Sequence, residues 1–132
     1  MPPRQDLGAQ FARITRKLIT LEQPLLADHG LTMWEYAVLL RLRAAPAETQ
    51  LQLAQAINYD KTRLIALLDG LERRGLVARE QAVGDRRART VRLTPAGRAT
   101  VAATQRDIHR MEDRLLDGDG RAALQRLLDE FN

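Results

Sequence analysis

The order of the patterns in the middle of the chain constrains its fold most strongly. Two helical patterns separated by a short turn, residues 50–57 and 61–74, are followed directly by two β-like runs, residues 76–80 and 90–93. The segment between the runs, residues 84–89, carries three arginines in its last four positions. This order predicts a helix-turn-helix followed by a β-hairpin wing whose tip is strongly cationic.

Capping residues bound the two central helices. Thr49 and Gln52 form a capping-box pattern, and Asp60 stands before the second helix as its N-cap. Gly75 is the expected C-terminal stop of that helix. Both helices are amphipathic, and their inward-facing residues are expected to be Leu53, Ala54, Ile57, Leu64, Leu68 and Leu71.

Two further helical patterns precede this centre. The first runs from about Leu7 to Asp28 with a heptad-like apolar seam, and Pro24 is expected to kink or interrupt its last turn. The second begins at a capping box that starts with Thr32 and is bounded by Pro46. Both patterns therefore predict helices on the N-terminal side of the helix-turn-helix.

Two more helices are expected after the wing. A long helix begins with Thr94 as its N-cap, the segment Gly118–Gly120 breaks the chain, and a final helix follows. The first and last helices carry apolar seams but have little core of their own, so we expect them to pair in a homodimer. The predicted fold is a mainly α winged helix-turn-helix, with residues 1–31 and 99–132 for dimerisation and residues 32–98 for DNA binding.

Positive charge is concentrated in the central part of the chain. Residues 50–98 hold ten basic and five acidic side chains, a net charge of +5, whereas the remainder of the 132 residues has a net charge of −1. A localised basic segment is the electrostatic pattern expected of a surface that contacts nucleic acid.

The sequence also argues against several function classes. It contains no cysteine, which excludes disulfides, thiolate metal sites and thiol-based redox sensing by this chain. His29 and His109 are too far apart in sequence to suggest a metal site. No catalytic triad, carboxylate pair or phosphate-binding glycine loop stands out, so we expect neither an enzyme nor a cofactor. Without a membrane-length apolar run or a signal-peptide core, a cytoplasmic protein without membrane contact is expected.

The second central helix has the division of faces that a DNA-reading helix requires. Lys61, Thr62 and Arg63 lie at its N-terminal end, where they can reach base edges in the major groove. The wing arginines are expected to enter the adjacent minor groove, whose negative potential favours inserted arginine. Gly70 costs the helix about 1 kcal/mol relative to alanine, which the close approach of another surface would explain. The candidate DNA contacts are Thr49, Gln50, Lys61, Thr62, Arg63, Arg73, Arg74, Arg86, Arg87 and Arg89.

Each of these elements alone also has an ordinary explanation. The basic outer face of an amphipathic helix is usually a solvated surface, and an arginine-rich hairpin is only somewhat more specific. Their adjacency favours a dimeric, DNA-binding transcription regulator. The alternative is a winged-helix protein-interaction module that docks proteins through the same surface without sequence-specific DNA reading.

Several motifs together point to a known family. They are densest in residues 53–57, 60–62 and 67–77, and a wing pattern of Asp-x-Arg followed by Leu-Thr-x-x-Gly extends from Asp85 to Gly97. In these motifs the chain resembles the multiple antibiotic resistance regulator (MarR) family of winged-helix transcription factors over nearly its whole length. The resemblance implies a repressor that forms a homodimer with interlocked terminal helices. It also implies a palindromic operator, and release of DNA when a small, often phenolic or anionic, effector binds.

The resemblance also implies roles for particular residues. The run Lys61–Arg63 matches the base-contacting start of the recognition helix, although the family more often has a small or β-branched residue where this chain has Arg63. Arg87 matches the wing arginine that enters the minor groove. Asp60 and Asp85 match acidic positions that orient neighbouring basic side chains.

The effector pocket of ligand-responsive members lies between the dimerisation helices and the winged domain. The residues of this chain that the resemblance places near such a pocket are Arg16, His29, Met33, Trp34 and Tyr36. Trp34 and Tyr36 are better explained as core or interface anchors than as a ligand cage. Oxidant sensing through a cysteine, which occurs in some members, is excluded here because the chain has no cysteine.

Overall fold

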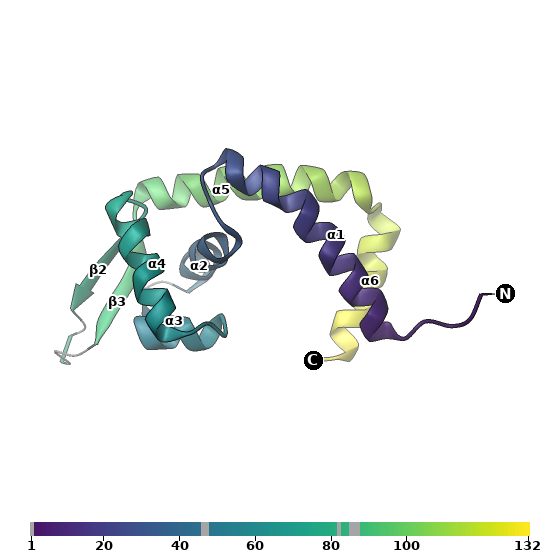
Figure 1. Ribbon diagram of the computed structural model, residues 1–132, viewed down its shortest axis with the longest axis horizontal. Helices are drawn as coiled ribbons and strands as arrows, with labels where there is room; N and C mark the ends of the chain where they lie inside the picture. The colour runs from purple at the N-terminus through teal and green to yellow at the C-terminus, as the bar shows by residue number, and fades with distance from the viewer. Residues whose placement is uncertain (1, 46–47, 82, 85–87) are drawn as a thin grey trace.

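The computed structural model describes residues 2–45, 48–81, 83–84 and 88–132. Figure 1 shows a winged domain on one side, helices α1 and α6 on the other, and α5 extending between them. The elements in chain order are α1 (Leu7–Asp28), α2 (Met33–Ala44), β1 (Glu48–Thr49), α3 (Gln50–Ala56), α4 (Lys61–Arg73), β2 (Val77–Gln81), β3 (Arg89–Leu93), α5 (Pro95–Leu115) and α6 (Gly118–Glu130).

The core of the winged domain is built on the leucine stripe of α4. Leu64, Leu68 and Leu71 are completely buried, as their spacing predicts. Burying a leucine contributes about 1.5–3 kcal/mol relative to leaving it exposed, so this stripe fixes which face of α4 turns inward. Residues from α2, α3, β3 and α5 complete the same cluster, among them Val38, Leu39, Leu42, Leu53, Val91 and Val101.

The predicted caps at Thr32, Thr49 and Asp60 are confirmed, whereas Asp6, the expected cap of α1, makes no side-chain capping hydrogen bond. The hydroxyls of Thr32 and Thr49 each accept a hydrogen bond from the backbone N–H three residues later. In turn, the side-chain oxygens of Glu35 and Gln52 accept the backbone N–H of Thr32 and Thr49. Asp60 caps α4. Each such cap satisfies backbone donors that the first helical turn leaves free, which explains why the local sequence defined these helix starts well.

The wing sheet contains a strand that the sequence did not suggest. β2 and β3 pair antiparallel, with Val77 opposite Leu93. The two-residue strand β1 pairs with the other edge of β3, so that the strand order is β1-β3-β2. A strand of two residues is too short to show alternation. It is held in place by a non-local contact, because Arg41 Nε of α2 donates to Glu48 Oε2 at 3.1 Å.

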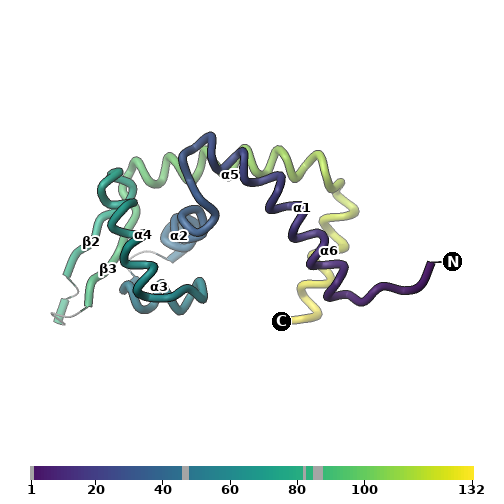
Figure 2. The backbone as a smooth tube through the Cα atoms, in the orientation of Figure 1, coloured from purple at the N-terminus to yellow at the C-terminus, as the bar shows by residue number. Residues whose placement is uncertain are grey.

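Helix α5 is anchored to the wing at its first turn. The hydroxyl of Thr94 accepts the N–H of Gly97 at 3.0 Å and donates to the carbonyl oxygen of Gly75 at 2.6 Å. Gly97 is buried, and a Cβ built on it would lie 2.0 Å from the carbonyl oxygen of Leu76. This close approach requires glycine. From this anchor α5 extends to the region of α1 and α6 (Figure 2).

Two local expectations were wrong. Interruption of α1 at Pro24 is the first: the helix continues through the proline, which removes one backbone hydrogen bond from a helix of 22 residues. A kink at Pro24 stays a prediction. The break near the C-terminus falls at Leu116 and Asp117, and Gly118–Gly120 form the first turn of α6. The reason is a cap: the Asp117 carboxylate accepts the N–H of Gly120 at 2.7 Å. Pro46, the expected boundary of α2, lies outside the described residues.

Helices α1 and α6 are poorly covered by the rest of the chain. Leu26 is the buried residue of α1, and α6 has none among the described residues. Within the described ranges, no helix combines the length and apolar character that crossing a bilayer requires. Large apolar side chains are left exposed on α1, at the end of α5 and the segment after it, and on α6 and its C-cap. They are Leu7, Phe11, Ile14, Leu115, Leu116, Leu124, Leu128 and Phe131.

Candidate nucleic-acid interface

The N-terminal end of α4 is presented to solvent. The Asp60 carboxylate accepts the N–H of Arg63 at 2.9 Å, which fixes where the helix begins. Lys61, Thr62 and Arg63 are exposed, while the leucine stripe on the opposite face is buried. Among the described residues, neither Lys61 nor Arg63 has an ion-pair partner. The predicted base-contacting run therefore carries two positive charges that are accessible to a polyanion.

Thr49 and Gln50 lie at the start of α3 and are half-buried. The Thr49 hydroxyl already accepts the N–H of Gln52 at 3.1 Å. The side-chain oxygen of Gln50 accepts a hydrogen bond from Arg79 Nη1 at 3.2 Å. Both side chains thus have partners within the protein, and the Gln50 amide is oriented by the wing.

Arg79 of β2 ties the wing to the recognition helix. Its side chain is 6% exposed, and its Nη2 donates to Asp69 at 2.5 Å and to Glu72 at 2.9 Å, both on α4. Its backbone N–H donates to the second oxygen of Glu72 at 3.2 Å. The hydrogen bond from the Arg79 side chain is the main cause that lowers the pKa of Glu72 below its usual value. Arg79 belongs to the basic segment in sequence but to the scaffold in the structure.

The sequence contained a weak signal for this role of Arg79. Strand alternation places Arg79 on the same face of β2 as the buried Val77. Asp69 and Glu72 are three residues apart, which puts both carboxylates on one face of α4. Only the fold brings these two patterns together, so composition alone counted Arg79 as surface charge.

Of the three predicted wing arginines, one lies within the described residues. Arg89 is exposed at the start of β3, whereas Asp85, Arg86 and Arg87 lie outside the described residues. Arg92, also on β3, pairs with Glu80 at 3.1 Å across the two strands, and both side chains are more than half exposed. Arg89 is thus the wing arginine whose exposure supports a role in DNA contact.

The two arginines at the other end of α4 lie apart from this surface. A helix of 13 residues is about 18 Å long, which separates them from Lys61. Arg73 is exposed. Arg74 Nη2 donates to the carbonyl oxygen of Gly30 at 2.7 Å, and its Nη1 donates to Glu35 at 3.2 Å. The sequence predicted that another surface approaches Gly70 closely. Within the described residues no such approach is found, because the nearest atom to a Cβ built on Gly70 is Arg73 Nη2, at 4.0 Å.

The candidate effector residues are distributed over α1, α2 and the junction between them. Arg16 is exposed on α1. His29 Nε2 forms a hydrogen bond with Asp107 Oδ2 of α5 at 2.7 Å. Met33 and Trp34 are 37% and 46% exposed, and the Trp34 ring packs edge-on against Tyr59 with ring centroids 4.4 Å apart. Trp34 is therefore a surface aromatic with one aromatic partner.

Tyr36 lies half-buried in a polar cluster between α1, α2 and α5. Burial is the main cause that raises the pKa of its phenol, and the carboxylates of Glu22 and Glu112 act in the same direction, whereas Arg43 opposes them. Burial also raises the pKa of Glu22, with a further contribution from Glu112. Arg43 Nη2 donates to Gln105 of α5 at 2.5 Å. This cluster connects the winged domain to α5 and α1.

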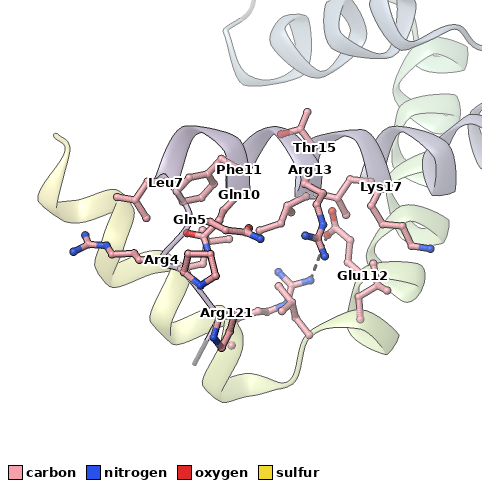
Figure 3. A pocket seen from close by; sticks show the side chains of 18 residues that line it. Arg4, Gln5, Leu7, Gln10, Phe11, Arg13, Thr15, Lys17, Glu112 and Arg121 are labelled. Atoms are coloured by element: carbon pink, nitrogen blue, oxygen red, sulfur yellow. Dashed lines mark hydrogen bonds and ion pairs between the residues drawn. The ribbon is translucent and has the colours of Figure 1, made fainter.

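A cavity of about 1360 Å³ lies between the N-terminal part of α1, the end of α5 and α6, as Figure 3 shows. Its wall is mostly apolar, and Arg121 reaches Glu112 at 3.3 Å beside it. None of the five effector candidates is among its lining residues. Across the described ranges, no three His, Cys, Asp or Glu side chains are grouped to hold a metal ion. The apolar residues of its wall include Leu7, Phe11, Ile14, Leu115, Leu116 and Leu124.

Comparison with known proteins identifies the family. The model of the MarR family matches residues 29–88. The chain is 31% identical to the transcriptional repressor CouR, whose structure was solved bound to a 23-mer DNA duplex; the match covers 96% of this chain and 92% of CouR with a TM-score of 0.84. The chain belongs to the MarR family. The predicted mainly α winged helix-turn-helix fold is confirmed, and this MarR-family protein is a DNA-binding transcription regulator.

Two other MarR-like structures are similar over almost the whole chain. A variant of MarR from E. coli in complex with operator DNA is 27% identical, and the match covers 95% of this chain and 92% of MarR with a TM-score of 0.78. BpsR from Bordetella bronchiseptica, solved in work on the regulation of its DNA binding by 6-hydroxynicotinic acid, is 26% identical. That match covers 96% of this chain and 98% of BpsR with a TM-score of 0.79.

Proposed function

We propose that this protein is a transcription repressor that binds a palindromic operator as a homodimer and releases the operator when a small-molecule effector binds. The observation that carries the DNA-binding step is the exposed cationic start of α4, Lys61–Arg63, opposite a completely buried leucine stripe. A helix held in this way can place its N-terminal residues in the major groove while the wing follows the flanking backbone.

The uncovered helices support the homodimer. The N-terminal half of α1 and nearly all of α6 are exposed within one chain, and the cavity between the two helices has a mostly apolar wall (Figure 3). Contiguous apolar surface of this kind usually marks a protein interface. A second copy placed on it by a two-fold axis would present two recognition helices to two half-sites. Residues 1–31 and 99–132 are the proposed dimerisation region, and residues 32–98 the proposed DNA-binding domain.

The comparisons support repression and effector release. CouR is a transcriptional repressor, and the DNA binding of BpsR is regulated by 6-hydroxynicotinic acid, a small hydroxylated aromatic acid. A phenolic or anionic effector of similar size is therefore proposed here, in a pocket that includes the five residues from Arg16 to Tyr36 named above. The proposed function involves no catalytic step, no cofactor and no membrane, and places the protein in the cytoplasm with its operator.

The test is binding of a fluorescent duplex from the promoter region of its own gene, followed by anisotropy at several salt concentrations. The double variant Lys61→Ala/Arg63→Ala removes both exposed charges, and Arg110→Ala removes an exposed positive charge from α5 as the matched control. We expect the double variant to bind at least tenfold more weakly, since a good base contact contributes about 1–3 kcal/mol. The control should bind within about twofold of wild type, the change expected when no phosphate contact is lost.

Two outcomes would contradict the proposal. Equal binding by the wild type and the double variant would show that the start of α4 does not contact DNA. Binding that is indifferent to sequence and disappears at physiological salt would favour the protein-interaction module instead. Effector release is tested separately, by adding hydroxylated aromatic acids to the preformed complex and following the anisotropy.

A further inference from the structure

The junction between α1 and α2 is fixed by bonds of its own. The N–H groups of Gly30 and Leu31 donate to the carbonyl oxygens of Ala27 and Leu26, each at 2.9 Å, and close the end of α1. Gly30 has a φ of +69°, which favours glycine, and a Cβ there would also lie 3.1 Å from Arg74 Nη2. The junction is therefore a defined turn that a neighbouring side chain closely approaches.

Residues from two other parts of the chain bond to this turn. His29 Nε2 and Asp107 Oδ2 of α5 lie 2.7 Å apart. Arg74, directly after α4, donates to the carbonyl oxygen of Gly30 at 2.7 Å and to Glu35 at 3.2 Å. The turn thus connects α5 to the C-terminal end of the recognition helix.

The guanidinium of Arg74 already has two hydrogen-bond acceptors within the protein. The carbonyl oxygen of Gly30 lies at the C-terminal end of α1, where the helix dipole favours a cation. Glu35 serves two purposes: its Oε1 accepts the N–H of Thr32 at 2.8 Å in the capping box, while its Oε2 pairs with Arg74. An arginine engaged by a carboxylate and a backbone oxygen has less to gain from a phosphate than the free side chains at the start of α4.

We propose that Arg74 is a positioning residue for DNA binding and not one of its phosphate contacts. It holds the end of the recognition helix against the α1–α2 turn, so that the angle of α4 follows the position of α1 and α5. Loss of the contact lowers the fraction of molecules with α4 in the binding orientation, and the apparent dissociation constant rises by the same factor. The inference deepens the proposed function, because it rests on α4 being the helix that binds DNA.

The salt dependence of duplex binding distinguishes a positioning residue from a phosphate contact. The variants are Arg74→Gln and Glu35→Gln. Arg73→Gln neutralises the exposed neighbour and is the charge-matched control for hydrogen exchange only, since Arg73 is itself a candidate DNA contact. We expect R74Q to weaken binding about tenfold with an unchanged slope of log K against log salt. E35Q, which retains the oxygen for the cap, should also weaken binding. A phosphate contact predicts the opposite for E35Q, since removing a nearby negative charge would leave binding unchanged or strengthen it.

Three results would overturn the inference. The first is a slope of log K against log salt that is less steep by about 0.9 in R74Q, the change expected for one lost phosphate contact. The second is tighter binding by E35Q. The third is wild-type DNA affinity in R74Q together with a reduced free energy of unfolding, which would make the contact purely structural.

A measurement without DNA separates failure of this inference from failure of the proposed function. Amide hydrogen exchange of the free protein should be faster in R74Q both at residues 28–32 and at residues 71–76, the two sides of the contact, and unchanged in R73Q. If the wild type binds no duplex, the proposed function is wrong, and the proposed role of Arg74 in DNA binding is wrong as well. Unchanged exchange in R74Q would reject the link between α4 and the turn on its own.

Discussion

Replacing Arg79 by methionine should weaken the attachment of the wing to the recognition helix. The variant keeps an unbranched aliphatic side chain in place of the arginine stem but removes the guanidinium that joins β2 to Asp69 and Glu72 of α4. The bond to Gln50 at the start of α3 is lost as well. The substitution therefore removes the polar contacts of one buried side chain with little change in packing.

The expected loss of stability follows from those contacts. Two hydrogen bonds between charged groups contribute about 1.5 kcal/mol each at the low end of the measured range. Asp69 and Glu72 are 45% and 38% exposed, so they regain water when the arginine is removed, which reduces the loss. We expect R79M to lower the free energy of unfolding by about 2 kcal/mol. The control is Arg92→Met, whose ion pair with Glu80 is more than half exposed on both sides and should contribute at most about 0.5 kcal/mol.

Urea unfolding at a fixed protein concentration measures both losses, since the stability of a dimer depends on concentration. The pH dependence supplies a second check. The pKa of Glu72 is lowered in the folded protein, chiefly by its hydrogen bond from Arg79. The resulting stabilisation is complete above the ordinary glutamate pKa of about 4.3 and is lost as the pH falls through the folded value. The difference in free energy of unfolding between wild type and R79M should therefore become smaller from pH 7 to pH 3. At pH 7, a loss of stability in R79M no larger than that in R92M would refute the reasoning.

Three further substitutions test the fold and the dimer. Gly97→Ala should lower the free energy of unfolding by at least about 2 kcal/mol in urea, since its Cβ would lie 2.0 Å from the carbonyl oxygen of Leu76; wild-type stability would show that α5 does not pack there. Gly70→Ala has no such clash and should stabilise the protein by up to about 1 kcal/mol without weakening duplex binding; weaker binding would mean that DNA itself approaches Gly70. Ile14→Glu, at a 54% exposed position in the cavity wall, should yield a monomer of unchanged helicity by sedimentation; a dimer would place the interface elsewhere.

The elements that could be predicted from the sequence are those with local causes. The spacing of Leu64, Leu68 and Leu71 fixes the inward face of α4 without information from the rest of the chain. The caps at Thr49 and Asp60 likewise depend on residues three positions away. The winged helix-turn-helix therefore followed from periodicity and capping.

The features that could not be predicted depend on partners distant in sequence. Arg79 and Arg74 belong to the same basic segment as Lys61, yet Asp69, Glu72, Gly30 and Glu35 engage them within the protein. Composition cannot separate an arginine that binds the scaffold from one that faces a groove, because the difference lies in which element packs nearby. Strand β1 was not predicted for a similar reason, since its position is set by pairing with β3 and by a contact with α2. The roles of Asp85, Arg86 and Arg87 stay predictions, because these residues lie outside the described part of the chain.

Selection of bound sequences from a pool of random duplexes tests the central claim most directly. If two recognition helices act together through a two-fold axis, the selected sequences will share an inverted repeat whose half-site centres are about 10 base pairs, one helical turn, apart. The same duplex should bind two copies of the chain. Recovery of a pool no different from the starting one, or of a single asymmetric site occupied by one copy, would contradict the account.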